Sequence, residues 1–122
     1  MKGNKILIVD DEPTIRLTLR KMLRDDHAVV EAGNGEEALV AAVTHKPNLI
    51  IMDLLMPGID GYTACYNLKE NPETKDIPVI MLTAVDHDLN RKLAEKMGAD
   101  GYMTKPIDKK DLLQTVEKYL KK

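Results

Sequence analysis

The sequence predicts an α/β fold in which one parallel sheet of five strands carries five helices on its two faces. Short apolar segments alternate with segments whose apolar residues recur at helical spacing, and the alternation repeats along the whole chain. Three of the apolar segments are unbroken runs, which are typical of strands buried on both faces. Strands that alternate with helices pair in parallel, because parallel neighbours need a crossover connection.

The first two strand–helix pairs precede residue 45. Residues 6–9 (ILIV) form the first predicted strand, and apolar residues three and four positions apart predict a helix over residues 15–23. A weaker strand is predicted at residues 28–30, because a short apolar segment falls where the alternation requires one. A second helical stripe follows over residues 38–43.

The remaining three pairs continue this order. Residues 49–52 (LIIM) and 79–82 (VIML) predict two more buried strands, and residues 101–103 predict a weaker fifth strand. Helices are predicted at residues 61–71, 89–97 and 112–120. Five parallel strands of this length favour the flavodoxin-like order 2-1-3-4-5.

Length and composition limit the classes of protein that need to be considered. A chain of 122 residues fits one domain, and 18 Lys+Arg against 20 Asp+Glu give a net charge of −2, so we expect no direct contact with nucleic acid. No apolar run approaches the roughly 20 residues of a membrane-spanning helix. The single cysteine cannot form an internal disulfide. We therefore expect a cytoplasmic protein with no membrane contact.

Polar residues follow four of the predicted strands. Asp10 and Asp11 follow the first strand, Asp53 the third, Thr83 the fourth and Lys105 the fifth. In an open parallel sheet, ligands bind beyond the carboxyl ends of the strands where the strand order reverses, which is here between the first and third strands. We therefore expect three carboxylates, a hydroxyl and an ammonium to meet at one crevice.

Three carboxylates in one small pocket repel one another. At about 5 Å and an effective dielectric constant of about 20, each pair costs about 3 kcal/mol, which raises at least one pKa. A hard divalent cation such as Mg²⁺ removes this repulsion and also binds phosphate oxygens. Asp53 stands alone after the central strand and is our candidate nucleophile toward phosphorus, with Asp10 and Asp11 as the metal-holding pair. Lys105 and Thr83 would neutralise the phosphoryl oxygens.

Four segments together resemble the signature of one protein family. Residues 9–13 (VDDEP), 52–61 (MDLLMPGIDG), 82–84 (LTA) and 105–106 (KP) are similar, in order and spacing, to the motifs of receiver domains of two-component response regulators. Each segment alone is a weak signal, whereas all four together are specific. The resemblance covers essentially the whole chain, so residues 1–122 are expected to form one receiver domain.

The resemblance implies a signalling domain and not a turnover enzyme. It implies phosphoryl transfer to Asp53 from a histidine kinase or a histidine phosphotransfer protein, which switches a downstream protein target or an attached output domain. It also implies that Asp11, Asp53 and the backbone carbonyl of Leu55 bind Mg²⁺, for which Mn²⁺ can substitute, and that Asp10 helps through water.

The same resemblance implies roles for residues outside the acid cluster. Lys105 would bind the phosphoryl group, and the peptide bond before Pro106 is expected to be cis. Thr83 would move toward the phosphoryl group and Tyr102 would rotate inward. These movements would alter the surface formed by the fourth helix, the fifth strand and the fifth helix.

Other interpretations are open at this stage. Asp11, followed by Glu12 and Pro13, has a structural alternative as the N-cap of the first helix. An aspartyl-phosphate phosphatase would use Asp10 as nucleophile and Glu12 as acid, although the helix start makes that geometry poor. A flavodoxin-type electron carrier shares the topology, but two aspartates after the first strand would repel the FMN phosphate. A free-standing receiver and a piece of a longer regulator are both compatible with the sequence.

Two apolar residues bear on the lifetime of the phosphoryl group. Leu55 lies two residues after Asp53, and Val85 lies two residues after Thr83. Many family members that lose the phosphoryl group quickly have polar residues there, which orient an attacking water. Since neither side chain here offers general-base help, we expect a long-lived phosphoryl group.

Overall fold

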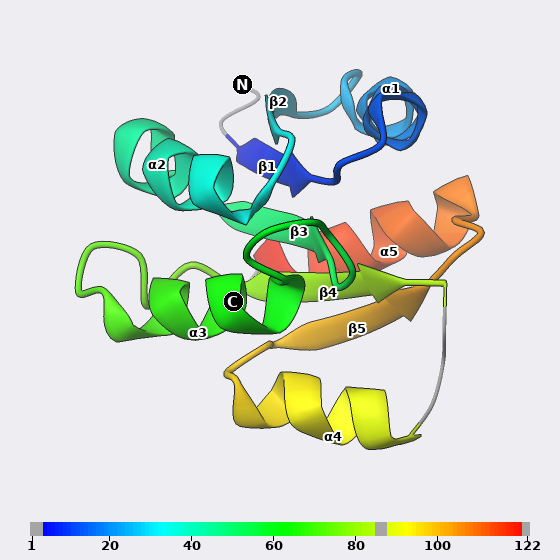
Figure 1. Ribbon diagram of the computed structural model, residues 1–122. Coiled ribbons are helices and arrows are strands. Elements are labelled where there is room, and N and C mark those ends of the chain that lie inside the picture. Colours follow the sequence, from blue (N-terminus) through cyan, green and yellow to red (C-terminus); the bar gives the residue numbers. More distant parts are fainter. Residues whose placement is uncertain (1–3, 85–87, 121–122) are drawn as a thin grey trace.

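A computed structural model describes residues 4–84 and 88–120 and shows strands and helices in strict alternation (Figure 1). The strands are β1 (Lys5–Val9), β2 (Ala28–Ala32), β3 (Leu49–Asp53), β4 (Val79–Thr83) and β5 (Gly101–Thr104). The helices are α1 (Pro13–Leu23), α2 (Gly35–His45), α3 (Gly61–Glu70), α4 (Asp88–Lys96) and α5 (Lys109–Leu120). The predicted order of elements is confirmed.

The strands form one sheet in which all neighbouring strands are parallel. Their order is β2-β1-β3-β4-β5, which confirms the predicted flavodoxin-like topology. The arrows of β1, β4 and β5 point the same way in Figure 1, and because every neighbouring pair is parallel, the carboxyl ends of the strands lie along one edge. The strand order reverses between β1 and β3, and the chain leaves these two strands toward opposite faces of the sheet.

Helices cover both faces of the sheet, which explains the unbroken apolar runs. In β1, Leu7 and Val9 belong to the core layer with α2, α3 and α4, whereas Ile6 and Ile8 belong to the layer with α1 and α5. All four side chains are fully buried. A strand covered on both faces has no solvent-facing side, so its sequence does not alternate.

The edge strands extend beyond their predicted ends. β2 continues to Ala32 and β5 to Thr104, and most of their residues are half-buried or exposed. Because an edge strand borders solvent, it needs fewer apolar residues than a central strand. This accounts for the weak signals at both segments.

The loop after β1 carries two aspartates into a helix start. α1 begins at Pro13, and Glu12, in extended conformation, occupies the N-cap position without a side-chain hydrogen bond. Asp11 is therefore not the N-cap of this helix. The interpretation of Asp11 as a helix cap is wrong, and the Asp11 carboxylate is available for another role.

The loop after β3 folds back closely on its own strand. The Gly61 N–H donates to the Leu54 carbonyl at 2.9 Å, and a Cβ atom at Gly61 would collide with the Asp53 carbonyl oxygen. Only glycine permits this approach. Asp60 caps α3 by accepting a hydrogen bond from the Thr63 N–H at 2.8 Å. The loop thereby holds the end of β3 in place.

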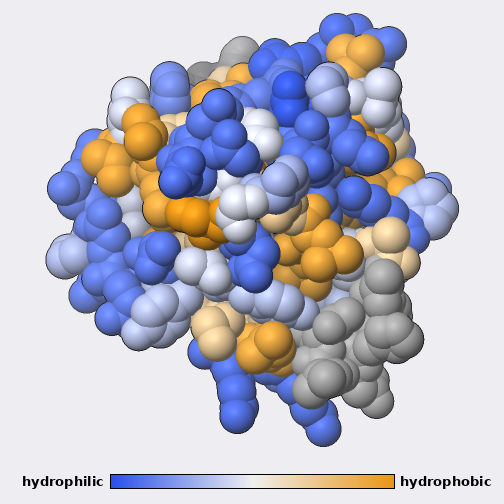
Figure 2. Space-filling view, viewed as in Figure 1, coloured by the Kyte–Doolittle hydropathy of each residue, from blue (hydrophilic) through white to orange (hydrophobic). Residues whose placement is uncertain are grey.

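The surface mixes hydrophilic residues with separate hydrophobic areas (Figure 2). Among the residues that the structure describes, large apolar side chains that reach solvent include Leu17, Val40, Leu55, Tyr66 and Leu93. Scattered apolar residues of this kind are normal on a folded protein. Within residues 4–84 and 88–120, no helix is both long enough and apolar enough to cross a membrane.

Candidate functional site

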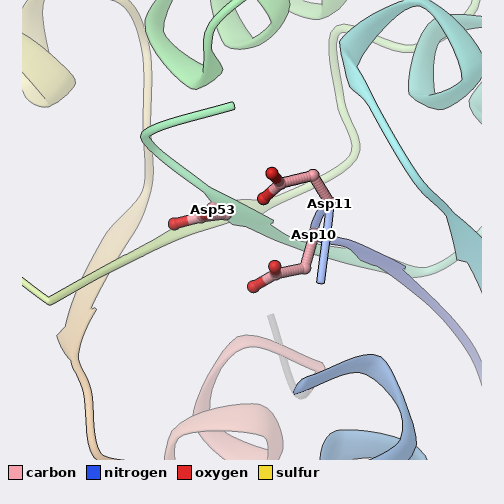
Figure 3. Close-up of side chains that lie close together, drawn as sticks. All are labelled: Asp10, Asp11 and Asp53. Carbon is pink, nitrogen blue, oxygen red and sulfur yellow. The ribbon is translucent and has the colours of Figure 1, made fainter. Parts of the chain in front are cut away.

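Three aspartates meet at the carboxyl ends of β1 and β3. Asp10, Asp11 and Asp53 each offer a carboxylate oxygen, and these oxygens all lie within 4.8 Å of one another. Figure 3 shows the three side chains projecting from the two strand ends toward a common space. Asp10 and Asp53 are buried, at 0% and 6% exposure, whereas Asp11 is exposed. The cluster predicted from the sequence is therefore present.

Among the described residues, the Lys105 ammonium faces this cluster. Its Nζ lies 3.2 Å from Asp10 Oδ2 and 3.6 Å from Asp53 Oδ1. The loop that carries it follows β5, and its N–H donates to the Thr83 carbonyl at 2.8 Å. The Lys105–Pro106 peptide bond is cis, as the resemblance implied. One ammonium thus stands between two buried carboxylates.

The pKa values of Asp53 and Lys105 show that negative charge dominates the site. The pKa of Asp53 is raised to about 6, mainly by burial and then by the Asp10 charge, against the opposing effects of the Lys105 charge and a hydrogen bond from the Leu55 N–H. Burial alone would lower the pKa of Lys105, but the Asp53 and Asp10 charges outweigh burial and raise it. One lysine therefore does not neutralise three carboxylates.

The donor set of this cluster fits a hard divalent cation. All three side chains offer carboxylate oxygens, the ligand type that Mg²⁺ and Mn²⁺ prefer. Asp10 is not fully free, since its Oδ1 accepts a hydrogen bond from the Glu12 N–H at 2.9 Å. The Glu12 side chain is exposed and does not belong to the cluster, so the phosphatase interpretation lacks its second acid.

The two residues named as switches lie on neighbouring strands. Thr83 is buried at the end of β4, and Tyr102 is half-buried in β5, where it pairs with Met81 in the sheet register. The Arg91 guanidinium of α4 lies 4.6 Å from the centre of the Tyr102 ring. Tyr102 thus connects β5 with α4, on the face where the resemblance expects the response to phosphorylation.

Of the two residues that bear on the lifetime of the phosphoryl group, the structure describes Leu55. Leu55 is 63% exposed and supplies no polar group near Asp53. Val85 lies outside the described residues. The long phosphoryl lifetime therefore stays a prediction.

An apolar hollow of about 440 Å³ borders the acid cluster. It runs between α1 and the loop after β5 and is lined by Ile15, Thr18, Leu19, Ala84, Lys105, Pro106 and Ile107. Since Lys105 lines the hollow and also faces the acid cluster, a molecule seated in the hollow would lie beside the aspartates.

One contributor to the site was missed from the sequence. The Arg16 Nη1 donates to the backbone carbonyl of Asp10 at 2.7 Å, although the side chain belongs to α1. At the sequence level Arg16 reads as part of the polar face of a helix. Its position three residues after Pro13, in the first turn after the acids, was the available signal.

Comparison with protein families identifies a match over most of the chain. The family model described as "Response regulator receiver domain" matches residues 6–117. PilH of Pseudomonas aeruginosa is 39% identical over 117 residues, which cover 95% of this chain and 97% of PilH. The transcriptional regulatory protein PhoP of Bacillus subtilis is 40% identical over 121 residues, which cover 98% of this chain but only 50% of PhoP. The chain thus spans nearly all of one relative and half of the other.

Solved structures agree with the family match. A putative response regulator from Chloroflexus aurantiacus is similar with a TM-score of 0.93 and 37% identity, covering 98% of each chain. The receiver domain of the sensor histidine kinase PA1611 from Pseudomonas aeruginosa, whose structure has a magnesium ion coordinated in the active site cleft, has a TM-score of 0.91 and 26% identity, covering 98% of this chain and 99% of that one. With its parallel sheet, its aspartate cluster and these matches, the chain belongs to the receiver domains of two-component response regulators.

Proposed function

We propose that this receiver domain signals by accepting a phosphoryl group on Asp53. The observation that carries the proposal is the convergence of Asp53 with Asp10, Asp11 and Lys105 at the carboxyl edge of the sheet. Asp53 ends the central strand, where a ligand at the crevice meets it directly. Membership of the receiver family supports the same chemistry.

The proposed transfer needs little covalent chemistry from the protein. An Asp53 carboxylate oxygen attacks the phosphorus of a phosphohistidine, so that a P–O bond forms while the P–N bond breaks and its electron pair leaves with the imidazole nitrogen. The products are an aspartyl phosphate on this chain and an unmodified histidine on the donor. The Lys105 Nζ lies 3.6 Å from the Asp53 carboxylate and would neutralise the phosphoryl oxygens. The Thr83 hydroxyl would donate a hydrogen bond to these oxygens.

We propose Mg²⁺ as the cation of the acid cluster, with Mn²⁺ able to substitute. Asp11, Asp53 and the Leu55 carbonyl would hold the ion directly, and Asp10 would act through water. When bound, such an ion neutralises carboxylate and phosphoryl oxygens. The all-oxygen donor set and the raised pKa of Asp53 both support a site that a cation completes.

The proposed partners are proteins. A sensor histidine kinase or a histidine phosphotransfer protein would supply the phosphoryl group, and the apolar hollow beside Lys105 supports docking of such a donor. A downstream protein or an attached output domain would respond to a population shift at Thr83 and Tyr102. The single domain over residues 1–122, its cytoplasmic location and the lack of direct contact with nucleic acid or membrane stay predictions.

Intact-mass measurement tests the acceptor. After incubation with acetyl phosphate and Mg²⁺, the unchanged protein is expected to gain the mass of one phosphoryl group, and Asp53→Asn is expected to gain none. Asp60→Asn is the matched control, because Asp60 lies in the loop that follows Asp53 and caps α3, a role that asparagine also fills. The proposal would be refuted if Asp53→Asn gained the phosphoryl mass. It would also be refuted if neither the unchanged protein nor Asp60→Asn gained it.

A further inference from the structure

Arg16 connects the acid cluster with an ion pair between α1 and β2. Its Nη1 donates to the Asp10 carbonyl at 2.7 Å, and its Nε donates to Glu31 Oε1 at 3.0 Å. The side chain is only 20% exposed. Because one planar guanidinium makes both contacts, the position of the Asp10 carbonyl is tied to β2.

Glu31 has a second arginine partner that does not make the same connection. The Arg20 Nε lies 2.6 Å from Glu31 Oε2, and the Arg20 Nη2 donates to the Val29 carbonyl at 3.4 Å. The Arg20 hydrogen bond is the main reason why the pKa of Glu31 is lowered, so this carboxylate stays charged. Arg16 and Arg20 therefore share an ion pair, whereas Arg16 alone of the two donates to Asp10.

The contact to Asp10 fixes the backbone between two of the acids. The carbonyl that accepts from Arg16 belongs to the planar peptide group that links Asp10 to Asp11. The Asp10 N–H donates to the Ala32 carbonyl at 3.2 Å, and Asp10 Oδ1 accepts from the Glu12 N–H at 2.9 Å. With the Arg16 bond, Asp10 is held through its amide, its side chain and its carbonyl. This peptide plane sets the position of the Asp11 backbone nitrogen, and with it the place from which the exposed Asp11 side chain extends.

We propose that Arg16 is a positioning residue for divalent-cation binding, which orients the Asp10–Asp11 peptide so that both carboxylates face the ion. The inference rests on the proposed function, since it requires that the acid cluster binds a cation. Groups that hold the ligands of a metal, without touching the metal, commonly change its affinity about tenfold to a hundredfold when they are removed.

Simple electrostatics predicts the opposite sign. Arg16 carries a positive charge within hydrogen-bond distance of Asp10, so it repels an incoming cation. If charge were its only influence, removing Arg16 would tighten cation binding. A positioning role predicts that removal weakens it. The two explanations are therefore separated by the direction of the change.

Calorimetric titration with Mg²⁺ and Mn²⁺ tests the proposal on Arg16→Ala and its matched control Arg20→Ala. Both variants lose one positive charge and one bond to Glu31. We expect Arg16→Ala to weaken cation binding about tenfold. Arg20→Ala is expected to bind as tightly as the unchanged protein or slightly more tightly. Arg16→Lys keeps the charge but cannot reach Asp10 and Glu31 together, so its affinity should fall between those of Arg16→Ala and the unchanged protein.

A second measurement uses the protein without metal. Hydrogen exchange of the Glu12 amide reports on its bond to Asp10 Oδ1, and we expect faster exchange in Arg16→Ala than in Arg20→Ala. The positioning role would be overturned if Arg16→Ala bound the cations as tightly as the unchanged protein or more tightly. It would also be overturned if Arg16→Ala and Arg20→Ala were weakened equally. Each of these results would leave the proposed function intact. If the unchanged protein binds neither cation, both the role of Arg16 and the proposed metal site fall.

Discussion

Two lysine–aspartate clusters at opposite edges of the sheet differ in how their charges are balanced. At the amino ends of β4 and β5, the Lys69 Nζ lies 2.8 Å from Asp100 Oδ2 and donates to the Ile77 carbonyl at 2.8 Å. Asp100 Oδ2 also accepts from the Val79 N–H at 2.8 Å. One cation faces one anion there, and the surrounding backbone supplies the remaining hydrogen bonds.

The cluster at the carboxyl ends is built from the same residue types but is left with excess negative charge. The Lys105 side chain is 18% exposed, nearly the same as the 17% of Lys69, yet Lys105 faces both Asp10 and Asp53 with Asp11 beside them. Burial therefore does not distinguish the two lysines. The ratio of acids to lysine does, and it separates a structural connection from a site that a cation completes.

The largest expected effect comes from the charge of Asp53. Its carboxyl pKa is about 6 in the folded protein against an ordinary 3.8, so the folded chain binds the proton more tightly than the unfolded chain. In chelator, the free energy of unfolding should therefore fall by about 3 kcal/mol, through this group, as the pH rises from about 4 to above 6. Asp53→Asn should remove this loss and be the more stable protein at pH 8.

Urea denaturation at several pH values measures the difference between these two proteins. Asp60→Asn serves as the control, because Asp60 lies outside the acid cluster. Equal stability of the unchanged protein and Asp53→Asn at pH 8 would contradict the excess negative charge that we assign to the cluster at the carboxyl ends.

A smaller effect is expected at the balanced cluster. Lys69→Met keeps the apolar stem of the side chain but leaves Asp100 without its cation and the Ile77 carbonyl without its donor. Because both charges are partly exposed, we expect a loss of about 2 kcal/mol in the free energy of unfolding. The loss should be the same with and without Mg²⁺, which urea denaturation under both conditions checks. A loss that Mg²⁺ repairs would mean that the two clusters are coupled.

The sequence predicts those features of the fold and site that depend on pattern. Unbroken apolar runs predict the three central strands because both of their faces are buried, and parallel pairing brings Asp10, Asp11 and Asp53 to one edge. The ends of the edge strands were not predicted, since residues such as Glu31 in β2 carry no apolar signal. The contact between Arg16 and the Asp10 carbonyl depends on side-chain rotamers and on the packing of α1, which spacing alone does not contain.

The smallest effect separates the two lysines directly. At a Mg²⁺ concentration a few times its dissociation constant, the metal should raise the free energy of unfolding of the unchanged protein by about 1 kcal/mol. The Lys105 ammonium competes for the Asp10 and Asp53 oxygens, so Lys105→Met should show a larger increment from Mg²⁺. Lys69→Met should show the increment of the unchanged protein. If Mg²⁺ no longer raised the free energy of unfolding of Lys105→Met, the lysine would instead be needed to assemble the cation site. The balance of charge would then not explain the difference between the two clusters.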